Sequence, residues 1–276
     1  MNILIIDGNE LAPSERYTKH GMLTQYEVYR NILTELSERF INLTIIHPAY
    51  SDYYLPQGVN LDDFDGVVWT GSLLNIYDLG DPIERQIDLA KTLLSKKNKM
   101  FGSCWGLQVL TTAAGGIIRK NPKGLEALIA DGIILNESGI NHPMYKKKPQ
   151  TFSSFCWHYD EVEQLPSNAV VLSSNNLSEV QSLSFSVNNS EVWAVQYHPE
   201  FDPKWISGLM SQRKTLLLKE KIFSSSEEFD KLHLYLSDIK KYDYLKSELI
   251  ISDTLIEKNI HTAELSNWLR NLNNDI

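Results

Sequence analysis

The chain has 276 residues, of which 42% are hydrophobic and 22% are charged, and its formal net charge is −9. This length allows one large domain, or a domain with an appendage, and the negative charge argues against binding nucleic acid or an anionic membrane. Two cysteines, Cys104 and Cys156, predict neither a disulfide framework nor a metal site. We therefore expect a reducing, cytoplasmic compartment, with no secretory leader and no membrane-spanning segment.

The first hundred residues alternate between short apolar runs and segments with helical spacing. Three runs predict strands: residues 2–6, 43–46 and 65–69. Two segments predict helices: residues 25–40, and residues 81–94 with Pro82 in the first turn. Residues 9–21 predict a polar loop. This alternation predicts parallel βαβ units in a doubly wound α/β fold, with functional groups at the carboxyl ends of the strands.

After Gly116 the pattern changes to strand-like segments without long helices between them. These segments are residues 133–135, 152–155, 169–172, 180–187 and 192–196. A turn at Asn188-Asn189-Ser190 predicts a hairpin from the last two, so we expect antiparallel strands added to the sheet. From Asp202 onward the pattern is helical, with a capping box at residues 225–228 and a last helix over residues 263–272.

The segment Gly102-Ser-Cys-Trp-Gly106 connects a short strand to a helical pattern that begins at Leu107. Glycine on both sides of Cys104 permits a sharp turn, which is typical of a nucleophile elbow with Cys in place of Ser. The helix N-terminus beneath the thiol would favour the thiolate. The alternative is a buried apolar cysteine, which is the interpretation that we adopt for Cys156 in its apolar strand.

A thiol nucleophile needs a base and a group that orients the base. His198 follows a predicted strand, and Glu200 comes two residues later. Side chains two residues apart on an extended segment point the same way, so Glu200 could hold the far nitrogen of His198. The alternative is a structural His–Glu pair.

Residues 102–108 and 195–201 together resemble the two signature motifs of the triad-type, class I glutamine amidotransferases. Residues 69–72 resemble the oxyanion strand of that family, residues 114–126 a segment of standalone GMP-synthase-like members, and residues 157–160 its His-x-Asp stretch. The resemblance implies a flavodoxin-like, mostly parallel sheet. It covers about residues 1–205, which we expect to form the catalytic domain, with residues 206–276 as a C-terminal helical extension.

The resemblance also implies a role for individual residues. The triad would be Cys104, His198 and Glu200. The oxyanion hole would be the backbone N–H groups of Trp105 and Ser72, with Gly71 allowing close approach. The substrate contacts would be Gln108, Tyr159 and Asp160, the last suited to an α-ammonium group.

Three further features accompany these motifs. Leu73 stands where the family often has proline, which removes a restraint on the oxyanion loop. Ser103 stands where an apolar residue is usual, which we expect to be a small change. The run at residues 146–148 predicts a solvated basic loop.

The family implies cleavage of the γ-amide of glutamine through a γ-glutamyl thioester on Cys104, giving glutamate and ammonia without a metal or cofactor. The C-terminal extension has no phosphate-binding loop, so use of the ammonia would require a separate synthetase or acceptor partner, for which this extension is a candidate docking element. One alternative is a γ-glutamyl hydrolase or peptidase for a small metabolite, as in the plant γ-glutamyl peptidases. Residues 9–21, with Arg16, Tyr17 and Lys19, would then shape a pocket for the leaving group. A non-catalytic binding module is the third hypothesis.

Overall fold

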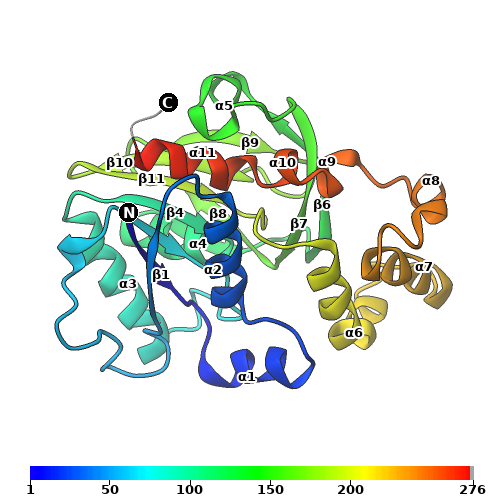
Figure 1. The fold of residues 1–276 in the computed structure, drawn as a ribbon, viewed down its shortest axis with the longest axis horizontal. Helices are drawn as coiled ribbons and strands as arrows, with labels where there is room; N and C mark the ends of the chain where they lie inside the picture. Colours follow the sequence, from blue (N-terminus) through cyan, green and yellow to red (C-terminus); the bar gives the residue numbers. More distant parts are fainter. Residues whose placement is uncertain (274–276) are drawn as a thin grey trace.

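The computed structural model describes residues 1–273, in which nine strands form one sheet and two form a second (Figure 1). The strands are β1 (Asn2–Ile6), β2 (Asn42–Ile46), β3 (Gly66–Trp69), β4 (Lys99–Ser103), β5 (Ile117–Lys120), β6 (Glu126–Leu135), β7 (Thr151–His158), β8 (Asp160–Gln164), β9 (Val170–Ser174), β10 (Ser182–Val187) and β11 (Ser190–Val195). The α-helices are α1 (Leu11–Lys19), α2 (Gln25–Leu36), α3 (Asp81–Leu94), α4 (Trp105–Ala113), α5 (Glu137–Asn141), α6 (Pro203–Lys219), α7 (Ser226–Ser237), α8 (Lys246–Leu249), α9 (Asp253–Ile256), α10 (Lys258–His261) and α11 (Ala263–Leu272). Among these helices, none has the length and apolar character needed to cross a membrane.

The large sheet has the strand order β2-β1-β3-β4-β11-β10-β9-β6-β7. The first five of these strands are parallel, and the pairs from β11 to β7 are antiparallel. This is the mostly parallel α/β fold with added antiparallel strands that the sequence predicts. β4 and β11 are parallel neighbours, with Ser103 opposite Val195. The segments that follow these two strands therefore leave the sheet side by side at the same edge.

Helices cover both faces of the parallel half of the sheet. On one face, α2 and α11 bury Tyr29, Leu33 and Trp268 against β1, β3 and β4. Figure 1 shows α11 lying across the sheet beside α2. On the other face, α3 and α4 bury a second apolar cluster that includes Leu93 and Leu107. Burial on both faces explains why the central strands are continuously apolar in sequence.

The structure confirms several of the predicted elements. The helices over residues 81–94 and 263–272 have the predicted bounds. The predicted hairpin joins β10 to β11, with positive φ at Asn188 (49°) and Asn189 (70°). Asparagine tolerates this conformation, which two-residue hairpin turns require.

The prediction of a loop over residues 9–21 is wrong, because most of that segment forms α1. Only Ser14 and Tyr17 are buried on this helix, so the sequence has no apolar periodicity that would reveal it. Its inner face packs instead through a tertiary contact, in which the Tyr17 ring lies 5.5 Å from that of Trp205.

The prediction that residues 146–148 are solvated is wrong for Lys148. Its side chain is fully buried, and its Nζ lies 2.8 Å from Oε1 of Glu264 in α11. Tyr197 also donates to Glu264 Oε1, at 2.7 Å. A sequence run of three lysines could not show this, because the counter-charge lies more than a hundred residues away.

The division into residues 1–205 and 206–276 remains a proposal.

Replacing Glu264 with Gln should destabilise the protein, because it leaves the Lys148 cation buried without a counter-charge. Breaking one side of a buried pair typically costs about 3–5 kcal/mol. We expect urea denaturation of Glu264→Gln to give a free energy of unfolding lower by about that amount. The control is Glu248→Gln, at an exposed pair with Lys231, which should change stability by less than about 1 kcal/mol. Equal losses in both variants would contradict a special role for the buried pair.

Candidate active site

Cys104 lies in a sharp turn between β4 and α4. Its backbone has φ 51° and ψ −103°, and its N–H donates to the Val195 carbonyl at 2.8 Å. A Cβ atom at Gly102 would lie 2.7 Å from the Gly106 carbonyl carbon, and one at Gly106 would lie 2.6 Å from the Trp69 carbonyl oxygen. Both glycines are therefore needed for close backbone approach. This is the strand–turn–helix geometry that the sequence predicts.

The Cys104 thiol is 4% exposed, and its Sγ donates to the Trp157 carbonyl oxygen at 3.5 Å. Burial raises the pKa of this thiol well above its ordinary value, and the carboxylates of Asp160 and Glu200 raise it further. Backbone N–H groups of Trp105 and Ser72 oppose this shift without reversing it. The N–H at the helix N-terminus thus favours the thiolate, as the sequence predicts, but burial and the two carboxylates outweigh it. The thiol needs a base.

His198 and Glu200 form a buried pair just after β11, the neighbour of β4. His198 Nδ1 lies 2.6 Å from Glu200 Oε1. The Phe201 ring stacks on the imidazole, with ring centroids 4.1 Å apart, and Trp205 stacks on Phe201 in turn. A carboxylate at Nδ1 fixes the tautomer that leaves Nε2 as a proton acceptor. The sequence predicts this orienting contact from spacing alone.

Ser103 makes two hydrogen bonds that the sequence does not indicate. Its Oγ donates to Glu200 Oε1 at 3.0 Å, and it accepts from the Tyr29 hydroxyl at 2.7 Å. The same carboxylate oxygen therefore accepts from both Ser103 and His198. From the sequence, serine in place of the usual apolar residue is expected to have little effect, because the partners of its hydroxyl lie far away along the chain.

The loop after β3 is fixed by hydrogen bonds, although Leu73 stands where proline is common. Leu74 N–H donates to Ser72 Oγ at 3.1 Å, and Asn9 Nδ2 donates to the Gly71 carbonyl at 3.1 Å. A Cβ atom at Gly71 would lie 2.7 Å from His198 Cε1. The loop thus approaches the imidazole as closely as only glycine allows. Its hydrogen bonds restrain it in the absence of proline.

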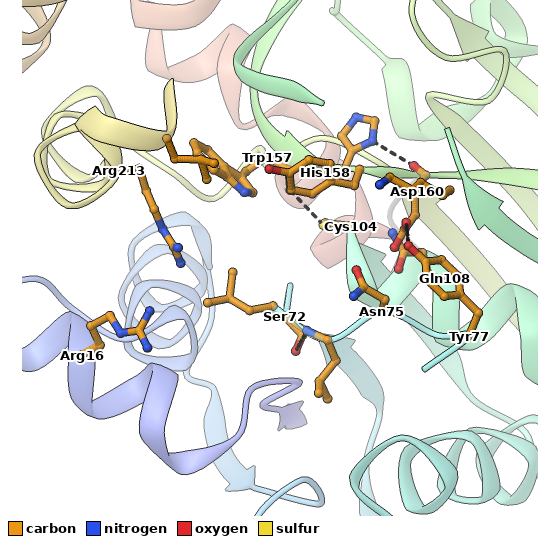
Figure 2. Close-up of a pocket in the computed structure, with 15 residues that line it drawn as sticks. Arg16, Ser72, Asn75, Tyr77, Cys104, Gln108, Trp157, His158, Asp160 and Arg213 are labelled. Atoms are coloured by element: carbon orange, nitrogen blue, oxygen red, sulfur yellow. Dashed lines mark hydrogen bonds between the residues drawn. The ribbon is translucent and has the colours of Figure 1, made fainter. Parts of the chain in front are cut away.

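A cavity of about 380 Å³ opens beside Cys104 (Figure 2). Five of the predicted site residues line it together: Ser72, Cys104, Gln108, Tyr159 and Asp160. Gln108 lies one helical turn after the thiol. His198, Glu200 and Trp105 are buried at the adjoining strand and helix ends. The structure therefore brings all the predicted residues to one edge of the sheet.

Other lining residues were not among the predicted contacts. They include Asn75 and Tyr77 from the loop after β3, Lys120 from β5, and Arg213 and Leu216 from α6. Tyr77 and Asn75 could have been suggested by their closeness to the oxyanion segment. Arg213 and Leu216 carry no signal of this kind, because they belong to the helix after the last motif.

Asp160 is held by a network of hydrogen bonds. The Tyr77 hydroxyl donates to Asp160 Oδ1 at 2.9 Å, and His158 Nδ1 lies 3.0 Å from the Asp160 carbonyl. His158 Nε2 in turn lies 2.8 Å from Glu126. Burial raises the pKa of Asp160, and the Tyr77 hydrogen bond opposes that shift. A cation in the cavity would be a favourable partner for this carboxylate. Within residues 1–273, no group of three or more His, Cys, Asp or Glu residues could hold a metal.

The family model for glutamine amidotransferase class-I matches residues 23–213. The chain belongs to this family. The γ-glutamyl-L-1-hydroxyisopropylamide hydrolase of Pseudomonas sp. is 28% identical over 280 residues, which cover 99% of this chain and 93% of that protein. γ-Glutamyl peptidase 4 of Arabidopsis thaliana is 25% identical over 192 residues, which cover 69% of this chain and 73% of that protein.

Other amidotransferases match less of the sequence or only its fold. A glutamine-hydrolysing GMP synthase subunit from Methanococcus aeolicus is 28% identical over 121 residues, covering 44% of this chain and 61% of that protein. The crystal structure of a glutamine amidotransferase from Thermotoga maritima superposes with a TM-score of 0.67 and 17% identity, covering 98% of both chains. This likeness supports the fold, including the C-terminal helices.

Alkylation of Cys104 should become faster with pH up to and beyond pH 9, because burial raises the pKa of its thiol. An ordinary thiol, with a pKa of about 8.5, would already be near its plateau there. The measurement is the rate of iodoacetamide labelling of the Cys104 peptide by mass spectrometry, with the Cys156 peptide followed separately. A plateau below pH 8 would mean that the thiolate is already formed in the resting site.

Ser103→Ala should reduce kcat, with glutamine or a γ-glutamyl amide as the test substrate, by about 10–100-fold with little change in KM, because Glu200 loses a donor to its charged oxygen. Tyr29→Phe removes the hydroxyl that donates to Ser103 and should have a smaller effect. The control is Ser207→Ala, which removes a hydroxyl that bonds to the His233 carbonyl. If Ser103→Ala retains the parent kcat, Ser103 does not position Glu200.

Proposed function

We propose that this protein hydrolyses γ-glutamyl amides through a thioester on Cys104, releasing glutamate and an amine larger than ammonia. One observation carries the proposal: the cavity continues past the thiol on both sides (Figure 2). Asn75, Tyr77, Gln108 and Asp160 lie to one side of Cys104. Arg16 and Arg213 lie to the other side. Ammonia, which is the leaving group when glutamine is the substrate, is too small to occupy this second side.

The side of the cavity that contains Asp160 suits the α-amino and α-carboxylate groups of the γ-glutamyl moiety. The Asp160 carboxylate is nearly inaccessible to solvent yet lines the cavity, which suits an α-ammonium group. Lys120 lines the same cavity and lies opposite Asp160 in the β5–β8 pair, which suits the α-carboxylate. Gln108, one turn after the nucleophile, adds an amide that can bond to either group.

In the proposed acylation step, Cys104 Sγ attacks the γ-carbonyl carbon while His198 Nε2 takes the thiol proton. The oxyanion would accept hydrogen bonds from the backbone N–H groups of Trp105 and Ser72, which already act on the sulfur. One such donor is typically worth about 10²–10³ in rate. His198 then gives its proton to the leaving nitrogen as the C–N bond breaks, and the thioester remains.

In the proposed deacylation step, water attacks the thioester carbonyl while His198 takes a proton from it. The C–S bond breaks, and the proton returns to Cys104. The sum is one γ-glutamyl amide and one water converted to glutamate and one amine. Glu200 stabilises the imidazolium in both steps and keeps its own charge.

The relatives support this choice of substrate. The Pseudomonas hydrolase, whose name gives a γ-glutamyl amide as its substrate, aligns over nearly the whole chain, including the C-terminal helices. Both cysteines here are free thiols. The proposed chemistry requires Cys104 in that form, so we propose a reducing compartment such as the cytoplasm.

Hydrolysis of free glutamine, with ammonia passed to a synthetase or acceptor partner, is the second candidate. It is favoured by the matched relatives named as glutamine-hydrolysing GMP synthases. It uses the same thioester and the same residues. The two functions differ only in the leaving group, so a comparison of substrates separates them.

Cys104→Ala should reduce glutamate formation by about 10⁴–10⁶-fold, because the nucleophile is lost. The measurement is glutamate release from γ-glutamyl-L-alanine, γ-glutamyl-L-alaninol and free glutamine, with wild type and Cys104→Ala side by side. We expect wild type to cleave the γ-glutamyl amides with a higher kcat/KM than glutamine. Cys156→Ala is the matched control and should retain activity. Preference for glutamine would favour the second candidate, and activity in Cys104→Ala at the parent rate would contradict both.

A further inference from the structure

The cavity has two chemically different sides, separated by the thiol. Figure 2 shows Asp160, Tyr77 and Gln108 on one side of Cys104, and Arg16 and Arg213 on the other. If the γ-glutamyl head group occupies the Asp160 side, as proposed above, the leaving amine must occupy the arginine side. The residues there therefore contain information about the chemistry of that amine.

Two elements far apart in the sequence supply the arginines. Arg16 comes from the last turn of α1, and Arg213 comes from α6. Contact between Tyr17 and Trp205 packs these two helices together, with ring centroids 5.5 Å apart. Arg213 also lies over the Trp157 ring, 5.9 Å from its centroid, next to the carbonyl that accepts from Cys104. The arginine side thus adjoins Trp157, the residue whose carbonyl accepts from the thiol.

Neither arginine has an acidic partner among residues 1–273. Three other arginines of this acidic chain do: Arg85, Arg119 and Arg270 each have a carboxylate oxygen within 3.3 Å. The Nε atom of Arg213 is buried and has no hydrogen-bond acceptor in the described part of the chain. A buried donor without a partner costs free energy unless a ligand supplies the acceptor.

Among the described residues, no acidic one lines the arginine side, since Asp160 is the carboxylate in the cavity lining and lies on the other side of Cys104. Arg16 is exposed and Arg213 is half-buried, so both guanidinium groups are accessible to an anion that enters the cavity. Arginine also presents several donors in a planar arrangement that matches a carboxylate. The missing group on this side is therefore an anion that arrives with the substrate.

We propose that Arg16 and Arg213 form a carboxylate-binding subsite for the leaving amine. The preferred substrates are then γ-glutamyl amino acids or short γ-glutamyl peptides, and not amides of neutral amines. This inference rests on the proposed function, because it assigns the leaving group of the same reaction. This substrate preference would distinguish the protein from its Pseudomonas relative, whose named substrate has a hydroxymethyl group where a γ-glutamyl amino acid has its carboxylate.

Two substrates differ only in the group that the subsite would bind. γ-Glutamyl-L-alanine has a carboxylate where γ-glutamyl-L-alaninol has a hydroxymethyl group. We expect wild type to cleave the first with a kcat/KM about 10–100-fold higher, as expected for charged hydrogen bonds. γ-Glutamyl-L-alanylglycine moves the carboxylate one residue outward, so its rate distinguishes amino acids from peptides as the preferred leaving group.

The variants Arg213→Gln, Arg16→Gln and their combination test the arginines directly. Each should lower kcat/KM for γ-glutamyl-L-alanine, with the largest loss in the double variant, while kcat/KM for γ-glutamyl-L-alaninol changes less than about twofold. The matched control is Arg30→Gln, an exposed arginine on α2 that does not line the cavity. Equal rates for the two substrates in wild type, or equal losses for both in the double variant, would overturn the subsite.

Binding to Cys104→Ala separates this inference from the proposed function. Calorimetry should show tighter binding of γ-glutamyl-L-alanine than of γ-glutamyl-L-alaninol, and Arg213→Gln in the same background should remove the difference. If this preference is found while wild type cleaves neither compound, the proposed function fails and the subsite stands. If wild type cleaves both compounds and Cys104→Ala binds them equally, the proposed function stands and the subsite fails.

Discussion

The geometry of the site depends on one backbone constraint, the positive φ of Cys104 between β4 and α4. A residue with a side chain rarely adopts this conformation, and Gly102 and Gly106 make it accessible by allowing the helix to approach the strand. Because β4 lies between β3 and β11, the loop after β3 lies on one side of the thiol and the His198 segment on the other. The catalytic groups that we propose are therefore arranged by strand order.

The electrostatics of the site follow from burial. Asp160 and Glu200 both disfavour a thiolate at Cys104, and their negative charges serve other groups in the proposed mechanism. Glu200 holds the imidazole, and Asp160 would face the head group of the proposed substrate. The proposed site therefore keeps its nucleophile neutral until a substrate arrives, and charge develops only where two backbone N–H groups and His198 can stabilise it.

The sequence predicted what depends on local spacing and missed what depends on distant contacts. The elbow, the His198–Glu200 contact and the helix bounds at residues 81–94 are short-range patterns, and the structure has all three. The bonds from Ser103 to Glu200 and Tyr29 join three separate segments, so no local pattern indicates them. The same reason explains the missed helix α1, the buried Lys148, and the place of Arg213 in the cavity wall.

The contacts of Glu264 and His261 have a consequence for the role of the C-terminal helices. Glu264 holds the hydroxyl of Tyr197, the residue just before His198, and His261 Nε2 lies 2.8 Å from the carbonyl of Phe201, whose ring stacks on His198. A chain ending at residue 205 would keep every proposed triad member but lose both of these supports. The C-terminal helices thus support the segment that carries the proposed base, and a protein that bound α10 or α11 could alter turnover without contacting the substrate.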